Sequence, residues 1–161
     1  MWRSILAGAA AGAAGTTALN AVGYADMAWR GRPASSAPDR VVERIAERID
    51  QSVPGEGETR GNRVSGLSGL SGTLTGVGIG AAAGLLRACG VHIPPAAGAA
   101  VFGAAAMAAT DGSMAALRVS DPRTWSAKDW VSDAVPHLAY GAVTATVLDA
   151  LTRPRTRRLS R

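Results

Sequence analysis

Four stretches of this chain are nearly free of ionisable side chains, which restricts the solvents in which it can fold. They cover residues 4–25, 64–86, 93–110 and 134–148, and only Tyr24, His137 and Tyr140 within them can titrate. A helix rises 1.5 Å per residue, so about 20 residues cross the roughly 30 Å hydrocarbon core of a bilayer. The pattern predicts four transmembrane helices, at about 4–29, 65–88, 94–118 and 133–152.

The composition is consistent with that prediction. Ala (34 residues) and Gly (20) make up about a third of the 161 residues, and only 18% of residues are charged. A soluble Ala-rich bundle is the alternative, favoured by a mean hydropathy of only +0.11. Soluble surface helices carry a charged face, however, and these four segments have none. We expect an all-α, polytopic membrane bundle forming one domain over 1–152, followed by a basic tail over 153–161.

The tryptophans fit the same layout. Trp2 and Trp29 flank the first predicted span and would be about 40 Å apart on a helix. Trp125 and Trp130 lie between the third and fourth spans, on the side of Trp29. Such positions are typical of the aromatic belts at the two membrane interfaces.

Small residues recur at four-residue intervals within two of the predicted spans. The helix-packing candidates are Gly72, Gly76, Gly80, Gly84, Ala100, Ala104, Ala108 and Gly112. Stripes of this kind, often called glycine zippers, let two helix backbones approach closely where water supplies no hydrophobic force. Two interpretations remain open. The stripes pack the helices of one chain together, or at least one faces a second copy or another membrane protein.

The first loop, 30–64, contains a predicted amphipathic helix. Residues 36–39 read as a capping box, and Val41, Val42, Ile45 and Ile49 then mark one apolar face. Arginines at 40, 44 and 48 line one flank. We expect this helix to lie on the membrane surface with its arginines near anionic lipid headgroups, or to cap the bundle in solvent. Residues 51–61 read as a flexible linker.

The net charge of +5 and the pI near 10.6 do not indicate nucleic-acid binding. The basic residues are divided between an acid-rich loop and the tail, without interleaved aromatic residues or a recognisable motif. Anionic lipid headgroups explain them more simply. Positive residues are enriched on the cytoplasmic side, but here the two sides conflict: seven of the 17 basic residues lie on the side of the termini and ten on the other. The dense tail favours a plasma-membrane protein with both termini in the cytoplasm.

Polar residues within the predicted spans are candidates for function because burying them in a bilayer is costly. Threading the chain up and down places seven of them in one half of the membrane: Asn20, Tyr24, Asp26, Asp111, Ser113, His137 and Tyr140. They form either a self-satisfied hydrogen-bond network or a shallow site around Asp111 and His137 for a cation, a proton or a polar headgroup.

Catalytic arrangements are missing from the sequence. Cys89 has His92 nearby but no acid close in sequence, and the glycines of 76–80 lie inside a predicted span rather than after a strand. A single cysteine provides no multi-cysteine metal site. We therefore expect no enzymatic activity, no cofactor and no metal.

Two segments carry a resemblance to known proteins. Residues 12–33, with Asn20 and Asp26, and residues 129–141, which end in His-Leu-Ala-Tyr-Gly, resemble small uncharacterised actinobacterial four-span membrane proteins. The second segment is also faintly similar to the YagU-like inner-membrane family. Neither resemblance implies an activity; both imply only a membrane location and a four-span architecture.

The functional expectation follows from these features. The chain is predicted to be a structural or interaction module that packs through its small-residue stripes. The alternative is a small transporter or an ion or proton conduit that uses the polar residues around Asp111 and His137. A pore needs polar groups across both leaflets, whereas these lie in one half only, so transport is the second choice.

Overall fold

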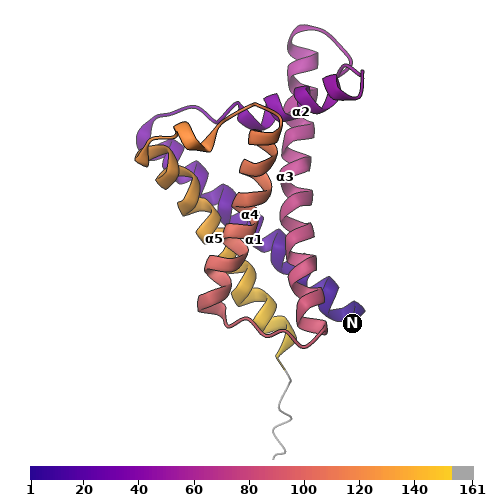
Figure 1. Cartoon of the computed structure of the whole chain (residues 1–161), viewed down its shortest axis with the longest axis vertical. Helices are drawn as coiled ribbons and strands as arrows, with labels where there is room; N and C mark the ends of the chain where they lie inside the picture. The colour runs from indigo at the N-terminus through magenta and orange to yellow at the C-terminus, as the bar shows by residue number, and fades with distance from the viewer. Residues whose placement is uncertain (154–161) are drawn as a thin grey trace, which may run out of the picture.

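The computed structural model describes residues 1–153, and these form helices joined by short loops (Figure 1). In chain order the elements are α1 (Trp2–Arg30), α2 (Ala37–Arg48), α3 (Gly57–Ala88), α4 (Pro95–Ala116), the 3-10 helix η1 (Pro122–Thr124) and α5 (Ala127–Thr152). No strand occurs in this part of the chain, so the all-α prediction is confirmed. Of the predicted basic tail, residues 154–161 lie outside the described residues.

The expected number of spans is confirmed only in part. Residues 1–153 contain five α-helices, of which three, α1, α3 and α5, are long and apolar enough to cross a membrane. The remaining long helix, α4, is not among them. Its last two turns contain the polar run of residues 110–113, and the rest is mostly Ala and Gly, whose hydropathy is modest.

Two helices begin earlier than the sequence predicted. Helix α3 starts at Gly57, so the helix takes in half of the predicted linker over 51–61. Helix α5 starts at Ala127 rather than at 133, because Ser126 and Asp129 form a reciprocal capping box. This box satisfies two backbone N–H groups at once and fixes the helix start there. Asp133 therefore lies inside α5 and not at its start.

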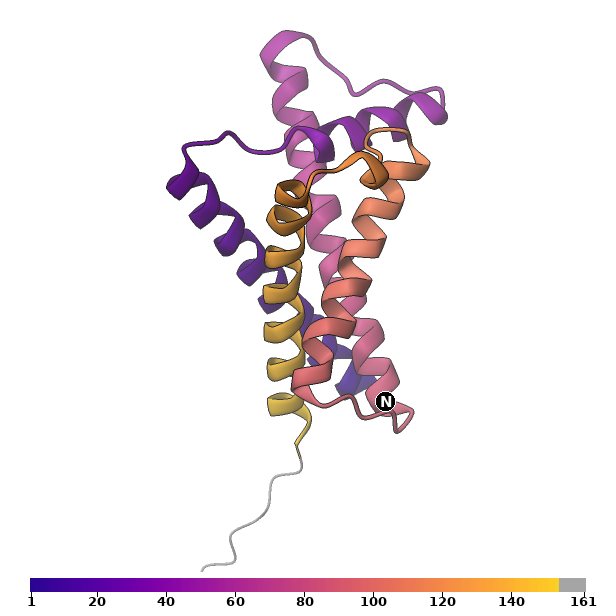
Figure 2. The same cartoon turned by 60° about the vertical axis from the view of Figure 1, so that its left-hand side comes forward.

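Helices α1 and α3 are in backbone contact where their glycines meet. A Cβ on Gly8 would lie 2.8 Å from the Cα of Gly84, and one on Gly12 would lie 3.0 Å from the Cα of Gly80. Toward its C-terminal end α1 diverges from α3, as both views show (Figure 1, Figure 2). Consequently Gly72, higher on α3, has no neighbour within 4 Å of its Cβ position.

Helices α4 and α5 form a second close pair. A Cβ on Gly103 would lie 2.7 Å from the carbonyl oxygen of His137, and one on Gly141 would lie 2.5 Å from the amide nitrogen of Gly103. The predicted α4 stripe is not the surface in contact: Ala100, Ala104 and Ala108 are exposed, and Gly112 has no neighbour. The inward face of α4 instead carries Gly98, Phe102, Gly103, Ala106 and Asp111.

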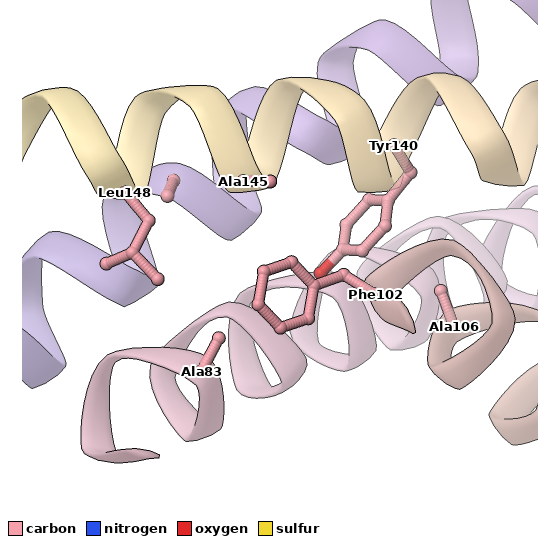
Figure 3. Close-up of a cluster of buried hydrophobic side chains, with 7 residues drawn as sticks. Ala83, Phe102, Ala106, Tyr140, Ala145 and Leu148 are labelled. Atoms are coloured by element: carbon pink, nitrogen blue, oxygen red, sulfur yellow. The ribbon is translucent and has the colours of Figure 1, made fainter. Parts of the chain in front are cut away.

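The core between these pairs is small. Figure 3 shows Phe102 and Tyr140 at its centre, with Ala83, Ala145 and Leu148 beside them. Tyr140 is only 1% exposed, and its hydroxyl donates a hydrogen bond to the carbonyl oxygen of Gly76 at 2.6 Å. This bond joins α5 to α3 through a buried polar contact.

Candidate functional site

The strongest concentration of buried polar groups lies between α4 and α5, near the end of the bundle that carries η1. Helix α4 contributes Thr110 and Asp111, and α5 contributes Asp133 and His137, which are one helical turn apart. Asp111 is 7% exposed and His137 is 8% exposed. We call these four residues the acid–histidine cluster.

The hydrogen bonds of His137 define which ring nitrogen carries the proton. Nδ1–H donates to the backbone carbonyl oxygen of Asp133 at 2.8 Å, and the same nitrogen lies 3.4 Å from Oδ2 of Asp133. On the other side of the ring, Nε2 lies 3.4 Å from the hydroxyl oxygen of Thr110. A neutral His137 with its proton on Nδ1 therefore keeps Nε2 as an acceptor, and Nε2 is the atom that takes up a second proton.

Two carboxylate oxygens in the cluster lack partners. Oδ1 of Asp111 and Oδ2 of Asp133 are buried and accept no hydrogen bond from any described residue. Burying a charge without partners is unfavourable, so such a carboxyl group is stabilised by gaining a proton or a cation. The cluster has the chemistry to hold an additional proton. Across residues 1–153, no three His, Cys, Asp or Glu side chains are close enough together to hold a metal ion.

The structure divides the predicted polar layer into separate groups. Asp111 and His137 are brought together, whereas Tyr140 points toward α3 and bonds to Gly76. The other four residues are placed elsewhere: Asn20, Tyr24 and Ser113 are exposed, and Asp26 pairs with Arg30 and Arg32 at 2.9 and 2.6 Å. The helix packing is the reason: α1 packs on α3 and α5 rather than on α4, with Asn20 and Tyr24 on its exposed faces, and Ser113 lies on an exposed face of α4.

Sequence reasoning missed two members of the cluster, Thr110 and Asp133. The spacing of Asp133 and His137, four residues apart on one helix, was a usable signal because such residues share a helix face. The predicted span begins at 133, which places Asp133 at the helix end and not on its inward face.

A second polar cluster joins α3 and α5 at the opposite end of the bundle. Asp149 is 7% exposed and pairs with Arg87 at 3.2 Å and with Arg153 at 2.6 Å. Arg87 also contacts His92 in the loop between α3 and α4. A cavity of about 10 Å³ beside Asp149 has room for one water at most. Since two guanidinium groups neutralise the carboxylate, this cluster has the properties of a structural ion pair that joins α3 to α5.

The predicted surface helix is present as α2, but its start differs from the prediction. Ser36 is the N-cap residue and makes no side-chain capping bond. Asp39 instead accepts hydrogen bonds from Ser65, at 2.8 Å, and from Ser68 on α3. A carboxylate that accepts two hydroxyl groups from a neighbouring helix fixes α2 against α3, and this tertiary contact replaces the local capping box.

Comparison with known proteins adds no further information on the site. No family model matches the chain, and neither a curated protein nor a solved structure matches it. The resemblance to small actinobacterial membrane proteins and to the YagU-like family stays a prediction.

Proposed function

We propose that this chain is a multi-pass integral membrane protein that serves as a structural or interaction module. The observation that carries the proposal is the outward-facing apolar surface of the long helices. In the most apolar window of α1 and of α3 only 22% of residues are buried inside the chain, and in that of α5 only 39%. Leu70, Leu74 and Val131 are 60%, 68% and 61% exposed. Soluble monomers rarely expose contiguous apolar surface on this scale, whereas a bilayer covers it.

We further propose that α4 is the fourth span. Its 22 residues correspond to about 33 Å of helix, which is sufficient for the hydrocarbon core. Its inward-facing Asp111 is covered by α5, so the polar group does not meet lipid. With four spans both termini and the α3–α4 loop share one side of the membrane, which we assign to the cytoplasm of a plasma membrane.

Resistance to alkaline extraction tests membrane insertion, and Cys89 tests the topology. Cys89 is the only cysteine, lies at the end of α3 and is exposed. An impermeant maleimide should label it only after the cells are opened. The control is a Cys89→Ser, Gln51→Cys double variant, whose thiol lies on the opposite side in the four-span topology and should react in intact cells. Labelling of both thiols from one side would refute the four-span arrangement.

The interaction part of the proposal rests on the outer face of α4. Ala100, Ala104 and Ala108 are exposed because no other helix of the chain covers them. This stripe is therefore available to a second copy of the chain or to a membrane protein partner. An Ala104→Leu substitution should lower the oligomer fraction, or the yield of a co-purifying membrane partner, in native mass spectrometry. Ala13→Leu makes the same change at an exposed position on α1, away from the stripe, and is the matched control. Equal behaviour of both variants would contradict an interface at this stripe.

A second candidate function, proton or cation conduction, is favoured by the unpartnered Oδ1 of Asp111. A pH-sensitive dye trapped in proteoliposomes would report proton flux under an imposed membrane potential. Asp111→Asn should abolish such flux, while Asp121→Asn, in the η1 loop outside the cluster, should leave it unchanged. Flux that persists in Asp111→Asn, or no flux from the parent protein, would eliminate this function.

A further inference from the structure

An open groove separates α2 from the C-terminal end of α4. Its volume is about 230 Å³, many times the roughly 10–15 Å³ that a single water requires. Most of its lining is charged, and the lining residues are Arg40, Glu43, Arg44, Glu47, Arg118 and Val119. We call it the α2–α4 groove. Its largely charged lining distinguishes it from the apolar lateral surfaces of the long helices.

The carboxylates of the groove are already neutralised, whereas two of its guanidinium groups are not. Glu43 pairs with Arg60 at 2.6 Å, and Glu47 pairs with Arg44 at 2.9 Å. Arg40 and Arg118 have no acidic side chain within 4.0 Å in the described part of the chain. Two uncompensated guanidinium groups at one groove favour an anion, and guanidinium geometry matches phosphate oxygens well.

The C-terminal end of α4 borders the groove, but it repels an anion less than a free helix C-terminus would. Carbonyl groups at a helix C-terminus carry partial negative charge and repel anions. Here Nη2 of Arg48 donates to the carbonyl oxygen of Ala116 at 2.9 Å, which satisfies and partly neutralises that end. Arg118 follows in the left-handed region with φ 57°, a conformation that non-glycine residues rarely adopt.

The position of the groove indicates that its anion belongs to a lipid. Trp29 is 91% exposed at the end of α1, and the half-exposed Trp130 lies in the first turn of α5. The end of α1 and the start of α5 lie at the end of the bundle where α2 lies (Figure 1). Ile45 and Ile49 are exposed on α2 itself. Exposed tryptophans and amphipathic helices are typical of the headgroup level of a bilayer, where phosphates are concentrated.

We propose that the α2–α4 groove binds the phosphate of an anionic membrane lipid through Arg40 and Arg118. This proposal rests on the proposed membrane location and adds a lipid site that the small-residue stripes do not require. The bound lipid bridges α2 to the end of α4, two elements that otherwise share few contacts, and so holds the surface helix in place.

Lipid titration of the delipidated full chain in mild detergent, read by native mass spectrometry, tests the proposal. The parent protein should bind one phosphatidylglycerol in preference to phosphatidylcholine. An Arg40→Gln, Arg118→Gln double variant should lose that preference, with affinity falling roughly tenfold per arginine removed. Arg40→Gln alone, at an exposed position, should show an intermediate loss. Arg63→Gln changes an exposed arginine at the same end of the molecule but outside the groove, and should bind like the parent.

Three results would overturn the proposal. These are equal binding of the two lipids by the parent, an equal loss in Arg63→Gln, and displacement of the lipid by soluble glycerol phosphate at the same concentration. Alkaline extraction of each variant is measured in parallel. Extraction of the parent protein from membranes at alkaline pH would refute the proposed membrane function itself. Retention in the membrane, together with equal binding of phosphatidylglycerol and phosphatidylcholine, would refute only the proposed lipid site in the α2–α4 groove.

Discussion

The contact between α1 and α3 makes Gly80→Ala the sharpest test of this structure. A Cβ at Gly80 would lie 2.6 Å from the Cα and the amide nitrogen of Gly12, where ordinary contacts are 3.4–4 Å. The carbonyl oxygen of Gly8 would lie closer still. The colliding atoms are backbone and cannot rotate away, so the helices must separate by at least about 0.8 Å, a gap at which contacting atom pairs already lose a quarter to a half of their attraction. Overpacking of this kind costs about 1–3 kcal/mol.

A matched substitution on the same helix isolates that cost. Gly72→Ala introduces the same methyl group where no atom lies within 4 Å. Both substitutions gain the same helix propensity of roughly 0.5–1 kcal/mol, which cancels in the comparison. The free energy of unfolding of Gly80→Ala should therefore be lower than that of Gly72→Ala by about 1–3 kcal/mol.

Unfolding by SDS titration in mixed micelles, followed by circular dichroism, measures this difference. A Gly80→Leu variant should be affected more strongly, because its side chain is larger. Equal unfolding free energies for Gly72→Ala and Gly80→Ala would show that the two helices do not cross at Gly80, and the argument for backbone contact would fail.

Three further predictions concern single polar contacts. Tyr140→Phe removes the buried hydrogen bond to the carbonyl oxygen of Gly76 and should lower the unfolding free energy by about 1 kcal/mol in the same titration. Ser126→Ala removes half of the capping box of α5 and should cost about 1 kcal/mol, with hydrogen exchange increasing only in its first turn. Hydrogen bonds from the Arg123 side chain hold the pKa of Asp121 below its ordinary 3.8, so they stabilise the loop above that pH and are lost as the pH falls through the lowered pKa. A carbon-13 NMR titration should show this low pKa, and Arg123→Gln should raise it; an unchanged pKa would contradict the contact.

Much of the fold was predictable because it depends on local sequence. The long uncharged segments predicted the long helices, and the apolar spacing over 41–49 predicted α2. Helix starts were less predictable. Asp39 fits a capping box in the sequence but bonds to Ser65 and Ser68 across to α3, a contact that sequence spacing cannot reveal.

The candidate site was predictable only in part. Asp111 and His137 were expected together and do lie in one buried cluster, while the exposed Tyr24 was expected there and is not. Membrane depth places residues at the same level along a bundle, but it does not fix their direction around a helix axis. Which helices pack together, and the rotation of each helix about its axis, decide which polar groups meet.

The long Ala/Gly-rich helices with little charge were predictable from the sequence, because helix formation and solvent preference depend on composition and local spacing. Which small-residue stripe packs depends on the arrangement of the helices in space. The stripe over Gly76, Gly80 and Gly84 meets α1, whereas that over Ala100, Ala104 and Ala108 faces outward, since α4 packs on α5 through Gly98 and Gly103. The two stripes look alike in sequence. They differ because each helix presents several small-residue faces, and the crossing geometry of its neighbours selects the one that is buried.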